Sequence, residues 1–543
     1  MAADNTHVTG NIAHVAGLSH DVWYLVFQHV NDRNELFSLS QVCKGLYPLA
    51  TRSLYKLVVL GPNLYNYWEE PTKPESRTWV HALNMVRRLA ATPNPDQTRA
   101  VREIEVKHFQ NYYDDDPEAE EGEEQPEAVG DVRPMFKQAL PGFVMVLPNL
   151  RKVRLSGSTP KFNALIRALH EHPNKPEIEL LDEDGLRRVS GPLPGIVTLR
   201  ANVNPFRDTV EKPNTVIPDI QKLLFACTNL KFFALSMSGN YGGCMGPRIH
   251  HRQTYNFEFT SDDDTPFPPL ESLSIEGYEI EPDNEWPHWR DRLDWARLET
   301  LSLGPDPRSR GGTMCAGILG LAKGHATALR SLTVKEWASE REKCLPLEDF
   351  LMSFDTLEEL TIKQPSVPVS ALISHSKLKR LCLHCIEVRR PEGTHRPTLD
   401  AADLNLLDAS CPDLETLEID IARGASKEWP ESVIKPLATS FRNLRRLTLH
   451  CEVGIEFDYK VHQEEPFLPL LDETLAEAFA KPFFVLRGAS KLEKLTLMTG
   501  EDLRRFPQWP PAYKEKERSW SAVVDIWPPR EDGQVAVKER LEE

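Results

Sequence analysis

The sequence predicts an α/β fold in which a short module of three helices precedes an irregular solenoid, with a curved parallel sheet inside and helices outside. Two observations predict it. Near the N-terminus, apolar side chains recur at helical spacing. Beyond them, the phrase Leu-x-x-Leu-x-Leu returns in one register along most of the 543 residues. Stacked repeats share one continuous core, so the length of the chain indicates many repeats rather than many domains.

The first predicted helix lies within Gly17–Val30. Ser19 can cap its N-terminus, and Asp21 complements the helix dipole in the first turn. Its apolar stripe consists of Val22, Val26 and Val30, with Trp23 and Phe27 beside it. This face is wider than one small helix buries by itself, so we expect it to dock on the repeats or on a partner.

Two further helices follow after breaks in the pattern. Asn31–Asn34 ends the first helix, and Gly45 and Pro48 mark the break before the third. The apolar positions are Leu36, Leu39, Val42 and Cys43 in the second helix and Leu49 and Leu54 in the third. The core of such a module is small for a domain that stands alone.

These helices resemble an F-box. The family pattern runs Leu-Pro-x-Glu-Ile/Val-Leu-x-x-Ile-Phe-x-x-Leu and then Leu-x-x-Leu-x-x-Val-Cys-Lys/Arg-x-Trp-x-x-Leu. The matching positions are Leu18, Val22, Phe27, Leu36, Leu39, Val42, Cys43, Lys44 and Leu49. Asp21, Val26 and Val30 are conservative departures, whereas Ser19 replaces the opening proline and Leu46 replaces the tryptophan.

The resemblance implies a partner. An F-box binds a Skp-family adaptor and through it a cullin ubiquitin ligase. The adaptor-binding residues that it implies are Leu18, Val22, Val26, Phe27, Val30, Leu36, Leu39, Val42, Cys43 and Lys44. The alternative, from the residues alone, is a helical cap that closes the open end of the solenoid.

The repeats occupy most of the remaining chain. Ten clear copies end at Leu155, Leu235, Ile275, Leu303, Val334, Ile362, Leu383, Ile419, Leu449 and Leu497, and weaker copies lie at Leu54–Val59, Val101–Val106 and Ile196–Ala201. Their spacing of about 20 to 50 residues is typical of leucine-rich repeats with inserted loops. An F-box followed by such repeats is similar to the arrangement in fungal F-box proteins.

Each repeat predicts a strand and a return segment. The two closing apolar residues of a phrase are two apart, as on a short strand with one buried face. Return segments carry helical spacing, as in Leu470–Ala480, where Leu471, Leu475 and Phe479 share a stripe. The aromatic stretch Trp286–Trp295 is interpreted as an inserted loop.

We expect four segments, namely a flexible N-terminus at 1–15, the F-box-like module at 16–56, the solenoid at 57–500 and a cap or tail at 501–543. The acidic run Asp114–Glu127 lacks apolar periodicity and predicts a disordered insert at 112–132. In the tail, Trp509, Trp520 and Trp527 either pack across the last repeat or form a motif for a partner.

Composition bounds the compartment and the partners. A net charge of −17 argues against broad nucleic-acid binding, because phosphates require a basic surface. The nine cysteines are odd in number and scattered, which fits free thiols in a reducing compartment. No leader pattern and no apolar run of membrane-spanning length is present in the sequence. We therefore expect a cytoplasmic and/or nuclear protein that binds neither nucleic acid nor membrane.

Motifs for catalysis are missing from the sequence. It contains no His-Glu-x-x-His, no phosphate loop and no Gly-x-Ser-x-Gly turn. Cys382 and Cys385 have Cys-x-x-Cys spacing, but on a continuing strand they face opposite sides and cannot share a metal ion. The sequence thus indicates no catalytic residue, no metal site and no cofactor.

The predicted binding surface is the polar face of the strands. If the strands stack in register, Lys335, Lys363, His384, Asp420 and His450 form a column flanked by Arg380, Glu418 and Arg446. Mixed charges suit selective recognition of a protein target, and the alternative is a row of solvated strand residues. The sequence thus predicts a non-catalytic substrate receptor of a ubiquitin ligase, with an unknown target. The alternative is a repeat scaffold or inhibitor whose helices serve only as a cap.

Overall fold

The structure is a computed structural model of the chain. The described residues are 20–61 (without 31 and 43–45), 75–107 (without 92–94), 133–156, 163–183, 191–203, 216–237, 257–304 (without 258, 260–264, 279 and 281–284), 314–335, 345–385 (without 364–366), 397–453 (without 423–428 and 430), 470–500 (without 489), 522–529 and 535–540. Leu18, Ser19, Cys43, Lys44, the acidic run, Trp509 and Trp520 lie outside them. The chain divides into a first unit, up to Asn202 with Thr215–Phe232, and a second unit, Val203–Asn214 with Phe233–Glu543.

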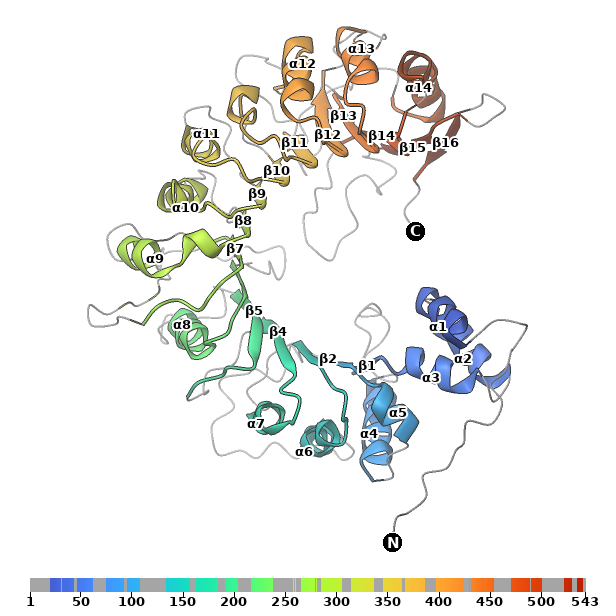
Figure 1. Cartoon of the computed structure of the whole chain (residues 1–543), viewed down its shortest axis with the longest axis vertical. Helices are drawn as coiled ribbons and strands as arrows, with labels where there is room; N and C mark the ends of the chain where they lie inside the picture. Colours follow the sequence, from blue (N-terminus) through green and yellow to red (C-terminus); the bar gives the residue numbers. More distant parts are fainter. Residues whose placement is uncertain are drawn as a thin grey trace, which may run out of the picture. The chain divides into compact units, whose positions relative to one another are not determined.

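Three short helices begin the described chain, namely α1 (His20–His29), α2 (Arg33–Val42) and α3 (Tyr47–Leu54) (Figure 1). They share a small core made of Phe27, Leu36, Leu46, Leu49 and Ala50, with Trp23, Val30, Leu39 and Leu54 packed against it. Pro48 lies in the first turn of α3, where a missing N–H costs nothing, and not in the break before it.

The rest of the first unit alternates strands and helices. Its strands are β1 (Leu57–Leu60), β2 (Glu103–Lys107), β3 (Lys152–Ser156), β4 (Glu177–Glu183) and β5 (Ile196–Val203). Its helices are α4 (Glu75–Ala91), α5 (Pro95–Ala100), α6 (Arg133–Met145), α7 (Asn163–Glu171) and α8 (Val216–Ala226). Neighbouring strands pair in parallel and in chain order.

The second unit continues this alternation. Its strands are β6 (Phe232–Met237), β7 (Ser272–Glu276), β8 (Thr300–Gly304), β9 (Ser331–Lys335), β10 (Glu359–Lys363), β11 (Arg380–His384), β12 (Thr416–Ile421), β13 (Arg446–Cys451), β14 (Lys494–Thr499), β15 (Ala522–Trp527) and β16 (Ala536–Glu539). Its helices are α9 (Trp286–Arg292), α10 (Met314–Ala322), α11 (Leu345–Leu351), α12 (Ala401–Ser410), α13 (Glu431–Thr439) and α14 (Glu473–Arg487), with short 3-10 helices η2 (Trp295–Arg297) and η4 (Val369–Ala371).

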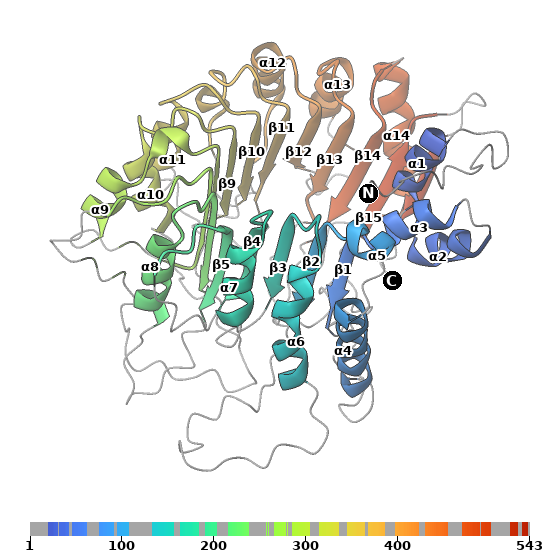
Figure 2. The same cartoon turned by 60° about the horizontal axis from the view of Figure 1, so that its bottom comes forward.

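The strands from β7 to β14 pair in parallel and in chain order, and β15 and β16 continue the sheet as antiparallel strands. Figure 1 shows α9 to α14 along one side of this row of strands, and Figure 2 shows β9 to β14 side by side. Strand after strand joined in parallel through a helical return segment is the architecture of a leucine-rich-repeat-like solenoid. In the described part of the chain, no helix combines the length and the apolar character that crossing a membrane requires.

The register of the repeat phrase is confirmed in the second unit. Leu332 of β9 pairs with Leu360 of β10, which pairs with Leu381 of β11. Each of these leucines is at most 1% exposed. A leucine ladder of this kind makes every strand depend on its neighbours, because deleting one such side chain removes about 2–5 kcal/mol of packing.

A second ladder, made of asparagines, joins successive repeats. Asn149, Asn229 and Asn443 each stand directly before the first leucine of a phrase. Their amides donate to carbonyl oxygens of the preceding repeat, at 2.8 Å for Asn149 and 3.0 Å for the other two. These bonds satisfy backbone oxygens in the tight turn that precedes each strand.

Two details of the array differ from the sequence-based expectation. In β1, the buried residues are Val58 and Leu60, not Leu57 and Val59, because strand pairing with β2 shifts the phrase by one residue and Leu54 belongs to α3. The strand β4 was missed because its first leucine position holds Lys175, as the pairing of β3 with β4 shows. Asn174, which donates to the carbonyl oxygen of Pro148 at 2.6 Å, is the ladder signal that could have revealed it.

The aromatic stretch after β7 is core rather than an exposed binding loop. Residues Trp286–Arg292 form α9, and Trp289 and Trp295 are 0% and 3% exposed. Phe257 and Phe267 pack against the Trp289 ring at centroid distances of 5.6 and 4.8 Å. Large rings are buried here because they fill the space between neighbouring return segments.

Candidate functional site

The predicted column of polar side chains follows the strand ends of the second unit. Lys335 pairs with Lys363, and Lys363 pairs with His384, while Asp420 pairs with His450. Lys335, Lys363, Arg380 and Arg446 are exposed. We call the first, third and fifth positions of β7–β14 the polar face, since they alternate with the buried leucines.

Three members of the column are not presented to solvent. His384, Asp420 and His450 are 5%, 4% and 5% exposed. This corrects the expectation that the whole column is a surface for a partner. Alternation along a strand predicts which face a side chain shares, but not what packs over that face.

The three buried residues form a compact polar cluster with Glu418. Nδ1 of His384 lies 2.8 Å from Oδ1 of Asp420, and Nε2 of His450 lies 2.8 Å from Oε1 of Glu418. The two imidazole rings stack with their centroids 3.8 Å apart. We call His384, Glu418, Asp420 and His450 the polar cluster.

Burial and neighbours set the protonation of this cluster. Burial lowers the pKa of His450, which outweighs the opposing hydrogen bond of Glu418, so the imidazole is neutral at neutral pH. Burial would raise the pKa of Glu418, but the hydrogen bond and charge of His450, the charge of Lys363 and the bond from Cys382 bring it to about 2. Because His450 is neutral, we attribute this low value chiefly to hydrogen bonding and to Lys363. Glu418 is therefore a carboxylate that accepts the N–H of His450.

Cys382 is not an activated nucleophile. Burial raises the pKa of its thiol, and the negative charge of Glu418 raises it further. Strand β11 ends at His384, so Cys385 lies beyond the strand, and its backbone N–H donates to Asp420 at 2.6 Å. The Cys-x-x-Cys spacing thus marks neither a reactive thiol nor a shared site.

An ion pair crosses the polar face between β7 and β9. Nζ of Lys335 on β9 lies 3.3 Å from Glu276 on β7, across Gly304 of β8. A Cβ added to Gly304 would approach Cγ of Glu276 to 2.8 Å. The glycine therefore leaves room for the carboxylate to reach across one strand, and both charges remain accessible to a partner.

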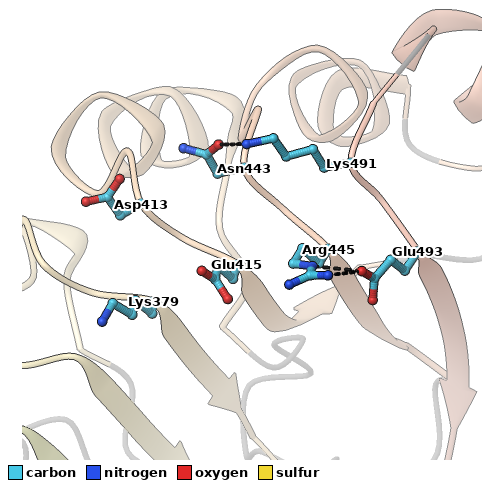
Figure 3. Close-up of a pocket in the computed structure, with 7 residues that line it drawn as sticks. All are labelled: Lys379, Asp413, Glu415, Asn443, Arg445, Lys491 and Glu493. Atoms are coloured by element: carbon cyan, nitrogen blue, oxygen red, sulfur yellow. Dashed lines mark hydrogen bonds and ion pairs between the residues drawn. The ribbon is translucent and has the colours of Figure 1, made fainter. Parts of the chain in front are cut away.

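A hollow of about 530 Å³ lies at the starts of β11–β14. It is lined by Lys379, Asp413, Glu415, Asn443, Arg445, Lys491 and Glu493 (Figure 3). Arg445 pairs with Glu493, and Lys491 donates to Asn443 at 2.8 Å. Three cations face three anions in this lining. A balanced set of charges suits a polar polypeptide better than a phosphate, which requires an excess of positive charge.

The predicted adaptor-binding residues on the N-terminal helices lie partly in the core of this module and partly on its surface. Val22, Val26 and Val42 are exposed, Phe27 and Leu36 are buried, and Val30 and Leu39 are half-buried. Sequence reasoning missed Leu25 and Phe37, which are 56% and 57% exposed. Leu46, at the position of the family tryptophan, is 3% exposed in the core of the module.

The comparisons with known proteins bear on the fold alone. No family model matches the chain, and no curated protein matches its sequence. A solved structure, the leucine-rich repeat-containing protein LegL7 from Legionella pneumophila, is similar over 85% of this chain and 96% of its own, with 12% identity and a TM-score of 0.26. At this TM-score the likeness adds nothing to the argument from strand pairing. The parallel strands, their buried ladder and their polar face are those of a leucine-rich-repeat-like solenoid.

Proposed function

We propose that the protein is a non-catalytic substrate receptor of a cullin ubiquitin ligase. Its repeats would hold a target protein, and its N-terminal helices would dock on a Skp-family adaptor. The protein contributes proximity, because it raises the effective concentration of the target at the ligase.

The observation that carries this proposal is the exposed apolar surface of α1 and α2. The exposed side chains are Val22 (41%), Leu25 (56%), Val26 (42%), Phe37 (57%) and Val42 (67%). Val22, Leu25 and Val26 share one face of α1, since they are three and four residues apart. Exposed apolar side chains that gather in this way are typical of a surface that binds a partner.

The presence of Leu46 in place of the family tryptophan is compatible with this role. Leu46 packs in the core with Phe27 and Leu49, so it fills the module from inside. The exposed surface lies on other residues, and the loss of the family tryptophan removes nothing from it. The resemblance supports a Skp-family adaptor as the partner, and the exposed surface supports docking of a partner at these helices.

Target binding is assigned to the second unit. The polar face exposes the cations Lys335, Lys363, Arg380 and Arg446, and the hollow at the starts of β11–β14 is lined by three cations and three anions. Charges of both signs held in fixed positions select among polypeptides by complementarity.

The test compares adaptor binding by charged variants of exposed positions. Val26→Asp with Phe37→Asp should weaken binding to a purified Skp-family adaptor by at least about 30-fold, because an apolar contact centre is worth about 2 kcal/mol or more. The matched control is Val485→Asp, an 82% exposed apolar residue on α14, which should bind as the unaltered chain does. Binding is measured by surface plasmon resonance with the full chain. Failure of the unaltered chain to bind any Skp-family adaptor would refute ligase membership.

The scaffold or inhibitor with a helical cap is the second candidate. The packing of α3 beside α5 and the bond from Gln97 to the Tyr55 hydroxyl, at 3.4 Å, favour it. Deletion of residues 1–56 separates the two. A receptor loses adaptor binding and keeps folded repeats, whereas a capped scaffold aggregates when its end is opened.

A further inference from the structure

Three metal-ligating side chains converge on neighbouring strands of the second unit. His384 ends β11, Asp420 lies on β12 and His450 on β13. One ligand atom from each lies within 4.8 Å of the other two. We propose that His384, Asp420 and His450 bind a divalent transition-metal ion, with Zn²⁺ as the first candidate.

The convergence exceeds what strand register alone provides. Neighbouring strands lie about 4.8 Å apart, so β11 and β13 are separated by about twice that spacing, with β12 between them. The two imidazoles nevertheless stack at a centroid distance of 3.8 Å. Both rings therefore lean toward the strand of Asp420, which brings two nitrogens and one carboxylate together.

The hydrogen bonds show which nitrogen of each imidazole can face a metal ion. Because a carboxylate only accepts, Nε2 of His450 carries the hydrogen that Glu418 binds at 2.8 Å, and Nδ1 holds the lone pair. Nδ1 of His384 donates to Oδ1 of Asp420 at 2.8 Å, so these two atoms face each other, and a metal ion bound between them would displace the hydrogen that they share. Metal-binding histidines are usually oriented by a carboxylate that accepts a hydrogen bond from the ring nitrogen that does not bind the metal. Glu418 would have this positioning role for His450.

The second oxygen of Asp420 is also held in place. Its Oδ2 accepts the backbone N–H of Cys385 at 2.6 Å, which prevents the carboxylate from turning away. Asp420 and Glu418 thus place two carboxyl groups beside the two imidazoles, and Asp420 is 4% exposed. A divalent cation compensates buried negative charge without adding bulk, so the cluster is electrostatically suited to one.

The donor set selects the class of metal. Two imidazole nitrogens with one carboxylate oxygen suit Zn²⁺ and its neighbours in the first transition series. Ca²⁺ and Mg²⁺ require mostly oxygen ligands, which this cluster does not supply. Among the described residues, Cys382 does not join the group of converging ligands, so a thiolate is not part of the set.

The experiment is a titration of the full-length chain, freed of metal with a chelator, with ZnCl₂ alone. Isothermal titration calorimetry should detect one tight, saturable equivalent. Asp420→Asn and His450→Gln should each weaken it by at least about 100-fold, and Glu418→Gln by about 10–100-fold, as expected for an outer-shell carboxylate. His325→Gln removes an exposed histidine of the same unit and should leave binding unchanged.

The variants decide the result, because a chain with 17 histidines and nine cysteines binds some zinc unspecifically. A second measurement does not depend on their folding. With Co²⁺, the unaltered chain should show visible absorption bands of a nitrogen and oxygen site and no thiolate charge-transfer band. Absence of a tight equivalent in the unaltered chain overturns the proposal. So does a thiolate band, or equal affinity in folded Asp420→Asn.

Discussion

Single residues show how burial separates side chains that the sequence makes equivalent. Lys335, Lys363 and His384 occupy the same position of successive strands, and their register followed from the phrase alone. The lysines are exposed, whereas His384 is buried and its neighbour Leu383 is only half-buried. The alternation breaks at this strand end. A periodic pattern cannot predict that, because it depends on the groups that pack around the strand end in space.

His375 is another buried histidine, and it lies outside the polar cluster. It is 0% exposed, and its ring packs against Phe354 at a centroid distance of 5.2 Å. Burial lowers its pKa, and the backbone contact of Leu351 and the charge of Asp355 oppose this shift only in part. His375 is thus a neutral imidazole held in an apolar setting.

This burial predicts a loss of stability in mild acid. The folded-state pKa of His375 lies below its unfolded value of 6.5, so the unfolded chain binds more protons as the pH falls below that value. The contribution of His375 to the free energy of unfolding is therefore complete above pH 6.5. As the pH falls from 6.5 toward the lower folded-state pKa, this contribution declines by up to about 1.4 kcal/mol per pH unit. His375→Leu should remove this part of the slope in urea unfolding followed between pH 7.5 and 5.5.

A comparison of variants is required, since His170 and His450 have pKa values lowered by burial as well. The exposed His325→Leu is the matched control and should keep the slope of the unaltered chain. An identical slope in His375→Leu and the unaltered chain would show that His375 does not titrate in this window.

Elements are held to their neighbours by contacts at their ends. Helix α14 begins where the Asp472 side chain accepts the N–H of Leu475 at 2.7 Å, an N-cap that the sequence-predicted stripe placed within two residues. Its other end is anchored by Arg487. The guanidinium donates to the carbonyl oxygens of Leu437, Ser440 and Phe441 at 3.0, 3.2 and 2.9 Å. No sequence pattern pointed to this anchor, because its partners are carbonyl groups some 50 residues away.

We expect Arg487→Met to destabilise the second unit by about 2–4 kcal/mol. The change leaves three carbonyl oxygens at the end of α13 without their charged donor, and bonds to charged groups contribute about 1.5–3 kcal/mol each. Chemical unfolding followed by circular dichroism measures the change.

Lys481→Met is the control on the same helix. Lys481 is 63% exposed and pairs only with a half-exposed Glu477, so its loss should change stability by less than about 0.5 kcal/mol. Equal effects of the two substitutions would mean that the anchor does not stabilise α14.

At the scale of the whole molecule, a solenoid must close its ends. Strand β14 of the second unit pairs along Leu495–Thr499 with the antiparallel β15, and β16 follows. Asp525 of β15 holds this closure. It accepts from Thr496 at 2.9 Å and pairs with Lys494 at 2.8 Å and Arg540 at 2.9 Å. The described part of the tail thus covers a sheet edge with strands, while Trp527 remains 37% exposed.

Removal of residues 501–543 should make the chain self-associate. The deletion exposes the unpaired edge of β14, and a free edge recruits strands from other molecules. Size-exclusion chromatography with light scattering should show a larger mass for the shortened chain. Trp527→Ala keeps both strands and should elute like the unaltered chain. A shortened chain with the mass of a single copy would show that the edge needs no cover.

The sequence by itself determined the repeat and, in the second unit, its register and the strand positions that share a face. Those properties follow from apolar periodicity, which is a relation between residues a few positions apart and can therefore be recognised in a short stretch of sequence. It also predicted three N-terminal helices and pointed to a partner for them. The tertiary structure alone decided which of their side chains are exposed. It also revealed β4, which the sequence hides because Lys175 occupies the first leucine position of its repeat. It also brought His384, Asp420 and His450 together across some 66 residues of sequence. Exposure and convergence depend on what packs across a strand, and distance along the chain does not encode that.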